Sequence, residues 1–469
     1  MNFATGLEQY GERPALLLDG ADAVSYAALA QRADAVYARA DAPPAVNAAN
    51  AVVAIEADNG VAAVAGYLGA LRRGQPALLI DSALAPELRE RLYAHYGIGW
   101  VWGADGNWQA RSGNIAAEVH PDVALLLSTS GSTGAPTLVR LSLGNLQANA
   151  ESIATYLDID EHERPIMALP FHYSYGMSVL NSHLARGAAV LLTAEPVTGR
   201  GFWDFFRAAG ATSLAGVPTT YTLLRQLRFE RMDLPTLRTM TQAGGRLAEQ
   251  HVEWYATLAQ SRGQRFIVMY GQTEAAPRIA YVPPERLLDK PGAIGIAIPG
   301  GTLELVADDG AVIEAAGVVG ELRYRGTNVM LGYAECAADL ARPDGNGGVL
   351  LTGDLAERDA DGYYYVRGRR SRFIKVFGNR IGLDEVEMQL RAKGYEVAVT
   401  GRDDLMVVAL RGDAEQAGAL AALLPGWYRL HHSALRVKAV EAFPLSSAGK
   451  LQYAALLEQL APPTPERSR

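Results

Sequence analysis

The chain has few of the features that mark metal-binding, disulfide-linked or nucleic-acid-binding proteins. It contains one cysteine, Cys336, so it can form no internal disulfide bond and no thiolate zinc site. Its eight histidines show no spacing typical of a metal site. The 43 lysine and arginine residues are outnumbered by 51 aspartate and glutamate residues, and the resulting net charge of −8 argues against a general nucleic-acid-binding protein.

Long apolar segments are also missing. The longest weakly polar stretch, residues 61–71, is alanine-rich and falls well short of the roughly 20 residues that a membrane-spanning helix needs. The first residues include neither a basic segment nor an apolar one, so we expect no signal peptide. The sequence therefore predicts a cytoplasmic protein with no membrane partner.

What the chain does contain is the composition of a globular enzyme. Its 469 residues are 49% hydrophobic and 20% charged, and this length predicts two or three domains. Apolar segments at residues 51–55, 77–80 and 188–193 alternate with amphipathic helical segments. Such alternation predicts an α/β fold whose large N-terminal domain has mixed and parallel sheets covered by helices. After about residue 300, the alternating segments 320–325 and 362–367 predict a β-rich subdomain.

A domain boundary is predicted at residues 368–372, where glycine precedes a run of arginines. Glycine would give the backbone freedom, and the charges would keep a linker exposed. We assign residues 1–368 to the large domain and residues 369–469 to a small α+β domain joined to it by a hinge. Residues 461–469 are expected to form a disordered tail.

The most informative segment is Ser128-Thr-Ser-Gly-Ser-Thr-Gly-Ala-Pro136, which follows the apolar run at residues 123–127. The apolar run predicts a buried strand, and the residues after it predict an exposed loop. Glycines let a backbone approach a charged ligand and hydroxyl groups add donors, so the loop suits a polyphosphate. It is not a Walker A loop, because no Gly-Lys-Ser/Thr follows at the required spacing. A flexible surface loop is the alternative interpretation of this segment taken alone.

Four further motifs follow in the chain. They are Leu169-Pro-Phe-His-Tyr-Ser-Tyr-Gly176, Tyr270-Gly-Gln-Thr-Glu274, Thr352-Gly-Asp354 and Pro444-Leu-Ser-Ser-Ala-Gly-Lys450. Together with the loop, and in the same order, they resemble the motifs of the adenylate-forming (AMP-binding) superfamily. That superfamily includes acyl- and aryl-CoA synthetases, adenylation domains of nonribosomal peptide synthetases and firefly luciferase.

The resemblance implies a site that brings ATP and a carboxylic acid together. The β- and γ-phosphates would be held by the loop, through Thr129, Ser130, Gly131, Ser132, Thr133 and Gly134. Thr273 would contact the α-phosphate, and Glu274 would hold Mg²⁺, because a glutamate beside a triphosphate is unfavourable without a metal between them. Tyr270 would stack on adenine, Gly271 and Gln272 would complete this motif, and Gly244-Gly245 would form the pocket wall.

Three more residues are implied to contact the nucleotide. Asp354 would accept hydrogen bonds from both ribose hydroxyls, a role that suits the two oxygens of a carboxylate. Arg369 would be a second ribose contact, and its alternative is a solvated member of the arginine run. Lys450 would bridge the attacking carboxylate and the α-phosphate, so we expect it to be the main catalytic residue, with Thr273 and His172 as further catalytic residues.

Two positions depart from the family pattern. Thr137 stands where the loop commonly continues with lysine, so a cation near the γ-phosphate is missing, and Arg140 is too far along the chain to replace it. This departure bears on ATP affinity more than on the chemistry, since Lys450 and Glu274 remain. Ser371 replaces the aspartate or lysine that is usual at the hinge.

The segment Phe171-His-Tyr-Ser174 bears on the acid. Amino-acid adenylation domains usually carry Phe-Asp-x-Ser here, and their aspartate pairs with the substrate ammonium group. Histidine cannot make that ion pair at neutral pH, so we expect an acid without an α-amino group. By resemblance, His172 gates the acid pocket. The large residues Tyr173, Tyr175, Met177 and Tyr221 would crowd this pocket and favour a small aromatic or short acyl acid, although core packing explains them equally well.

The segment Lys375-Val-Phe-Gly378 bears on the acceptor. It matches a family segment that lines the pantetheine tunnel after the small domain rotates, and Lys375 and Gly378 are its key residues. We therefore predict a ligase that forms acyl-AMP, releases pyrophosphate and transfers the acyl group to the phosphopantetheine thiol of CoA or of an acyl carrier protein. The alternatives are an amide-forming ligase, a standalone amino-acid adenylation enzyme and a non-catalytic adenylate-binding relative.

Overall fold

The structure, a computed structural model, describes residues 2–43, 52–111, 118–128, 137–370, 372–376, 379–428, 431–446 and 451–461. The chain forms two compact units. Unit 1 holds the described residues up to Leu303 together with 324–350, and unit 2 holds 304–323 and the described residues from Leu351 onward. The boundary predicted at residue 368 falls inside strand β20 (Tyr364–Arg369), and the hinge stays a prediction.

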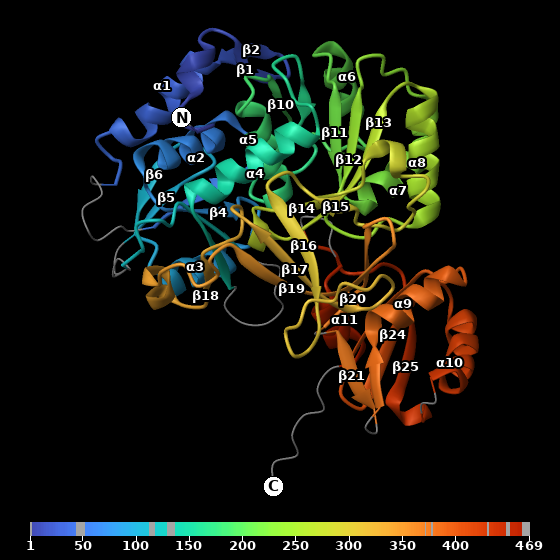
Figure 1. Ribbon diagram of the computed structural model, residues 1–469. Helices are drawn as coiled ribbons and strands as arrows, with labels where there is room; N and C mark the ends of the chain where they lie inside the picture. Colours follow the sequence, from blue (N-terminus) through green and yellow to red (C-terminus); the bar gives the residue numbers. More distant parts are fainter. Residues whose placement is uncertain are drawn as a thin grey trace. The chain divides into compact units, whose positions relative to one another are not determined.

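Unit 1 contains a nine-stranded sheet with the order β15-β14-β13-β12-β11-β9-β10-β1-β2 (Figure 1). Its six central strands from β13 to β1 are parallel, whereas β2, β14 and β15 are antiparallel to their neighbours. The bounds are β1 (Pro14–Leu18), β2 (Ala21–Ser25), β9 (Pro165–Ile166), β10 (Val190–Leu192), β11 (Ser213–Gly216), β12 (Thr239–Gln242), β13 (Arg265–Gly271), β14 (Arg278–Tyr281) and β15 (Ile296–Ala297).

A seven-stranded sheet of unit 1 has the order β18-β8-β7-β4-β3-β5-β6. Strands β7, β4, β3 and β5 are parallel, and β18, β8 and β6 are antiparallel to their neighbours. The bounds are β3 (Val53–Ala57), β4 (Ala77–Asp81), β5 (Trp100–Trp102), β6 (Trp108–Ala110), β7 (Leu125–Ser128), β8 (Leu138–Leu141) and β18 (Gly332–Ala334).

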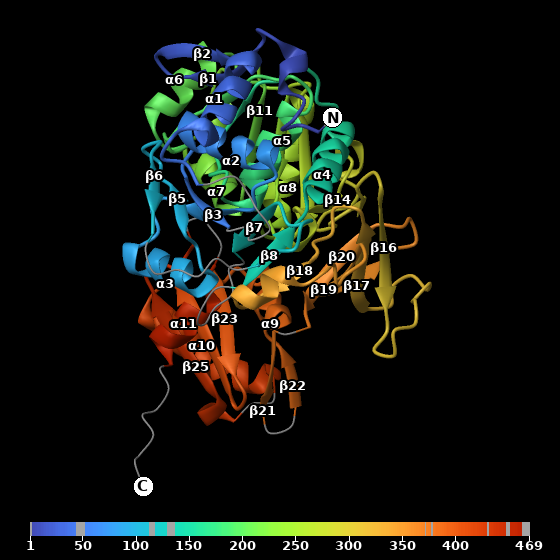
Figure 2. The ribbon, with the colours of Figure 1, turned by 90° about the vertical axis from the view of Figure 1, so that its left-hand side faces the viewer.

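The helices of unit 1 pack on these sheets. They are α1 (Tyr26–Ala38), α2 (Val61–Arg73), α3 (Pro86–Tyr96), α4 (Leu143–Tyr156), α5 (Ser174–Leu184), α6 (Arg200–Ala208), α7 (Pro218–Gln226) and α8 (Glu249–Ser261). Helix α4 begins with a capping box in which Ser142 Oγ accepts from the Asn145 backbone N–H, and Asn145 Oδ1 accepts from the Ser142 N–H. In Figure 2, α1 lies beside β1 and β2.

Helix α5 is buried on all sides. Each of its 11 residues is buried, from Ser174 at its first turn to Leu184 at its end. Its Leu180 belongs to one apolar core with Leu125 of β7 and Val190 of β10, so this core joins the two sheets of unit 1. The helix therefore gives a firm support to the loop that precedes it.

Unit 2 contains the smaller sheets. A four-stranded sheet, β16-β17-β19-β20, includes the unit boundaries, and two-stranded and three-stranded sheets follow. The bounds are β16 (Gly301–Val306), β17 (Gly320–Gly326), β19 (Val349–Arg358), β20 (Tyr364–Arg369), β21 (Phe373–Val376), β22 (Asn379–Gly382), β23 (Val397–Arg402), β24 (Leu405–Arg411) and β25 (Leu435–Val440). The helices are α9 (Leu383–Ala392), α10 (Ala414–Tyr428) and α11 (Tyr453–Leu460).

Alternate residues of β23 face opposite sides of the three-stranded sheet. Val397 and Val399 pack in one cluster with residues of α9 and α10, whereas Ala398 packs with Leu456 of α11. The predicted fold class is thereby confirmed, with a large α/β part, a β-rich part and a smaller α+β part. Within the described ranges, no helix is long and apolar enough to span a bilayer.

Candidate active site

The loop before α5 places His172 at the carboxyl ends of β3 and β4. The Nδ1 atom of His172 lies 3.3 Å from the carbonyl oxygen of Ala57, and Nε2 lies 3.7 Å from Oδ2 of Asp81. Burial lowers the pKa of His172, while the Asp81 carboxylate and the Ala57 carbonyl act in the opposite direction. Because the net shift is downward from 6.5, the imidazole is neutral at pH 7.

Asn59 holds this loop in place. Its side-chain amide lies 3.1 Å from the carbonyl oxygen of Met167 and 3.3 Å from that of Leu169, and its Oδ1 accepts a 3.2 Å hydrogen bond from the Phe171 N–H. The sequence reasoning missed Asn59. A polar residue just after a buried strand was the available signal.

A glycine turn lies beside Tyr173 at the end of β12. Gly244 has a φ of +84°, which favours glycine, and a β-carbon there would come within 2.6 Å of the Tyr173 hydroxyl oxygen. The buried Gln242 side chain donates a 2.9 Å hydrogen bond to the carbonyl oxygen of Gly245. Gln242 therefore shapes the predicted wall of the adenine pocket, a role that the sequence reasoning did not assign.

The motif at the end of β13 makes a tight turn back into β14. A β-carbon at Gly271 would lie 1.9 Å from the carbonyl oxygen of Pro277, so only glycine fits there. The same carbonyl accepts a 2.8 Å hydrogen bond from the Gln272 N–H, and the Gln272 side chain donates to the Tyr270 hydroxyl at 3.1 Å. Tyr270, the predicted adenine contact, is therefore positioned by a hydrogen bond from Gln272 of the same motif.

Two of the predicted motifs meet through their hydroxyl groups. Ser174 Oγ at the start of α5 lies 3.2 Å from Oγ1 of Thr273, which begins the short 3₁₀ helix η3 (Thr273–Ala275). The residues are 99 positions apart in the chain. The structure thus brings the His172 loop and the Tyr270–Glu274 turn together, as the predicted acid and α-phosphate contacts require.

Glu274, the predicted metal ligand, is half-buried. Its Oε1 accepts a 2.7 Å hydrogen bond from the hydroxyl of Tyr333, and its backbone oxygen accepts from the Met330 N–H at 2.8 Å. Carboxylate oxygen is the ligand type that Mg²⁺ prefers. In the part of the chain that the structure describes, no three histidine, cysteine or acidic side chains gather in a metal cluster.

Three of the four large residues assigned to the acid pocket, Tyr175, Met177 and Tyr221, lie in the core of unit 1. Tyr175 and Met177 are at most 1% exposed, and both Tyr175 and Tyr221 donate a 2.8 Å hydrogen bond to the carbonyl oxygen of Thr241. Tyr173 is only partly buried. Their contact with the acid stays a prediction.

Arg278 is a further buried residue beside this group. It is 2% exposed, and its guanidinium carbon lies 4.0 Å from the centre of the Tyr175 ring. Its Nε has no hydrogen-bond partner among the described atoms. The sequence reasoning did not single out Arg278, although an arginine in the apolar segment after the motif was a visible signal.

In unit 2, the two predicted ribose contacts lie side by side. Asp354 and Arg369 are strand partners in β19 and β20, and Arg369 Nε lies 3.0 Å from Oδ1 of Asp354. The Thr352 hydroxyl donates to the carbonyl oxygen of Leu322 at 2.8 Å and accepts from the Asp354 N–H at 3.1 Å. Asp354 is 3% exposed, so its carboxylate has a defined orientation.

Several predicted site residues lie outside the described residues. They are Thr129, Ser130, Gly131, Ser132, Thr133, Gly134, Ser371, Gly378 and Lys450. Lys375 lies in β21, but its side chain is also outside the description. Arg140 is buried in unit 1 and donates to the carbonyl oxygens of Leu331 and Pro343, so its role is structural.

The comparisons with known proteins agree on one family. Residues 99–334 match the family described as AMP-binding enzyme. Indoleacetate–CoA ligase of Aromatoleum aromaticum is 28% identical over 350 residues, which are 71% of this chain and 67% of that protein. L-proline–[L-prolyl-carrier protein] ligase of Pseudomonas fluorescens is 31% identical over 365 residues, which are 72% of this chain and 69% of that protein. Other curated relatives match over about half of their own length.

The fold has a counterpart among solved structures. O-succinylbenzoate Coenzyme A Synthetase from Bacillus subtilis, in complex with AMP, matches with a TM-score of 0.77. The match covers 97% of this chain and 98% of that chain at 24% identity. At this identity the similarity establishes the fold and leaves the substrate open.

Proposed function

The chain belongs to the AMP-binding enzyme family, and we propose that it is an ATP-dependent carboxylic acid–thiol ligase. It activates an acid as acyl-AMP, releases pyrophosphate and transfers the acyl group to the thiol of CoA. The observation that carries the proposal is the 3.2 Å approach of Ser174 Oγ and Thr273 Oγ1. Through this contact, the loop that carries His172 lies against the turn that ends at Glu274, which supports a shared site for the acid and the nucleotide.

The residues present fit ATP and Mg²⁺. Glu274 offers a half-buried carboxylate whose Oε1 is oriented by Tyr333, and a hard oxygen ligand of this kind suits Mg²⁺. When bound, the metal would neutralise negative charge on the phosphate oxygens. Glu274 is the residue that would hold it.

Each remaining residue has one task in this proposal. Tyr270 stacks on the adenine base, Asp354 accepts hydrogen bonds from the ribose hydroxyls, and Arg369, beside Asp354, is the second ribose contact. Thr273 donates a hydrogen bond from its hydroxyl group to an α-phosphate oxygen. Lys450 places its ammonium group between the attacking carboxylate and the α-phosphate, where it offsets the charge that builds up in the transition state.

For the acid, we favour a small aromatic or short acyl carboxylate without an α-amino group. The support is His172, whose imidazole is neutral. It occupies the position at which amino-acid adenylation domains carry an aspartate that pairs with the substrate ammonium group, and a neutral imidazole cannot form that ion pair. The similarity to indoleacetate–CoA ligase agrees with an aromatic acid and CoA. The similarity to the L-prolyl-carrier protein ligase supports a second candidate, an amino acid loaded onto a carrier protein.

The test is an acid screen by ATP–pyrophosphate exchange, in which aromatic and short acyl acids are compared with the proteinogenic amino acids. We expect exchange with one of the former, followed by thioester formation on CoA when products are analysed by mass spectrometry. Holo-carrier protein and amines serve as competing acceptors. Exchange with an amino acid, or transfer only to an amine, would contradict the proposal, whereas acid-dependent exchange would exclude a non-catalytic relative.

A further inference from the structure

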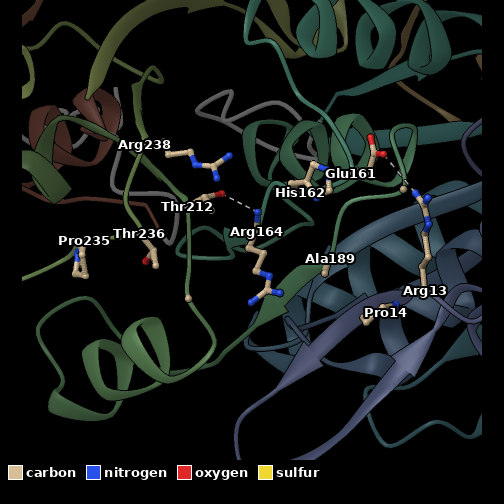
Figure 3. A pocket seen from close by; sticks show the side chains of 12 residues that line it. Arg13, Pro14, Glu161, His162, Arg164, Ala189, Thr212, Pro235, Thr236 and Arg238 are labelled. Atoms are coloured by element: carbon tan, nitrogen blue, oxygen red, sulfur yellow. Dashed lines mark hydrogen bonds and ion pairs between the residues drawn. The ribbon is translucent and has the colours of Figure 1, made fainter. Parts of the chain in front are cut away.

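A cavity lies in unit 1, at the amino-terminal ends of strands of the nine-stranded sheet. Its volume is about 620 Å³ (Figure 3). Its lining includes Pro14, which begins β1, and Thr212 and Arg238, which directly precede β11 and β12. In the same sheet, the predicted nucleotide contacts Gly244 and Gly245 follow the carboxyl end of β12, and Tyr270 lies at the carboxyl end of β13. Strands β11 and β12 have four residues each, so their amino-terminal and carboxyl-terminal ends are roughly 13 Å apart.

Three arginines line this cavity, namely Arg13, Arg164 and Arg238. Figure 3 shows them on different segments, with Arg164 projecting into the space between Thr236 and Ala189. All three are exposed, so each guanidinium group is accessible to a ligand. Such a concentration of positive charge contrasts with the net charge of −8 of the whole chain.

The carboxylates around the cavity only partly balance these arginines. Arg13 Nη1 lies 3.9 Å from Oε1 of the exposed Glu161, which is a loose ion pair. Arg238 Nη1 lies 3.7 Å from Oε1 of the buried Glu163, and that carboxylate also accepts a hydrogen bond from the Thr212 hydroxyl.

Arg164 differs from the other two arginines in its partner. Its Nη1 donates a 2.9 Å hydrogen bond to the carbonyl oxygen of Ala209, and no carboxylate of the described ranges forms an ion pair with it. The cavity therefore has three guanidinium groups against two carboxylates.

This arrangement fits an anion with several oxygens. A guanidinium group presents paired N–H donors that match phosphate and carboxylate oxygens, and small-molecule sites commonly have volumes of roughly 300–1,000 Å³. We propose that the cavity binds a small organic oxyanion with two or more negative charges, such as a phosphorylated metabolite. Arg164 is its central contact, and Arg13 and Arg238 flank it. The proposal does not rest on the ligase activity.

Titration calorimetry on the full chain tests this site, with tripolyphosphate and citrate as probes. We expect Arg164→Gln to weaken binding about tenfold, because one charge-assisted contact is lost. Glu161→Gln removes the carboxylate that competes for Arg13 and is expected to tighten binding. Arg200→Gln is the matched control, because Arg200 is an exposed arginine of α6 outside the cavity.

The two probes distinguish the chemistry of the ligand. Binding of both indicates recognition of charge, and binding of tripolyphosphate alone indicates phosphate geometry; either result supports the site if Arg164→Gln weakens it. Equal affinities of Arg164→Gln and Arg200→Gln would overturn the proposal, as would unchanged affinity in Glu161→Gln. Melting temperatures of all variants show whether a loss of binding reflects unfolding.

Discussion

The hydroxyl group of Tyr333 donates a 2.7 Å hydrogen bond to Oε1 of Glu274. Tyr333 lies in β18 of the seven-stranded sheet, whereas Glu274 follows β13 of the nine-stranded sheet. One sheet of unit 1 therefore orients a carboxylate carried by the other. In the proposed function, this hydrogen bond sets the direction in which Glu274 presents its oxygens to Mg²⁺.

Replacing Tyr333 with phenylalanine tests that role. We expect the Mg²⁺ concentration needed for half-maximal pyrophosphate exchange to rise about tenfold, because partners that orient metal ligands typically contribute this much to affinity. Tyr428→Phe is the matched control, since it also loses a tyrosine hydrogen bond, to Gln389 in unit 2. An unchanged Mg²⁺ dependence in Tyr333→Phe would show that the Tyr333 hydroxyl does not orient Glu274 for metal binding.

The second prediction concerns Lys450. Lys450→Ala is expected to lower acyl-AMP formation by about two to three orders of magnitude, because one preorganised charge is lost from the transition state. Thioester formation from supplied acyl-AMP should continue, since the α-phosphate is no longer attacked in that step. The two half-reactions are measured separately, with Lys438→Ala, an exposed residue of β25, as the control. Equal losses in both half-reactions would refute this division of labour.

The third prediction concerns the thiol tunnel. Gly378→Trp should leave acid-dependent pyrophosphate exchange near normal and strongly reduce thioester output, because the bulky ring would obstruct the path of the thiol alone. Both rates are measured together with the melting temperature, which detects a folding defect. Intact thioester formation in a folded variant would leave the tunnel assignment without support.

The fourth prediction concerns acid stability and His183. Burial lowers the pKa of His183 from 6.5 to about 4, and its Nδ1 lies 2.7 Å from the carbonyl oxygen of Val179. Since the unfolded chain then binds the proton more readily, this histidine lowers the free energy of unfolding as the pH falls from 6.5 towards 4. Between pH 7 and pH 4.5 the loss from this group is about 2 to 3 kcal/mol.

Denaturant unfolding of His183→Gln checks this value. The variant should show a smaller fall in unfolding free energy than the parent over the same pH range, by the amount stated above. His432→Gln, which removes an exposed histidine, should behave like the parent. A parallel pH profile in His183→Gln would show that other groups govern acid stability.

The sequence predicted those features that depend on local patterns. Alternating apolar and amphipathic segments predicted the α/β class. The sequence did not predict the residues that position the site, because their hydrogen-bond partners lie far away in the chain. Asn59 binds carbonyl groups 108 to 134 positions later, and Tyr333 lies 59 positions from Glu274. No local pattern encodes such contacts.

The acid pocket shows a different limit. On a helix with one apolar face, periodicity separates core residues from accessible ones. Helix α5 is buried on every side, so the positions of Tyr175 and Met177 in its sequence do not tell which side chains face the substrate and which fill the core. Their burial at 1% or less follows from the packing of two sheets around the helix.

The unit boundaries at residues 303, 323 and 350 fall inside strands of one sheet, with consequences for anyone who wants to dissect the protein. A fragment that starts at Leu351 would lack the segment 304–323 of its own unit. It would lose the carbonyl of Leu322 that Thr352 binds and the Glu321 carboxylate that pairs with Arg370. No single cut separates the halves, so truncation is a poor substitute for point substitution in assigning their roles.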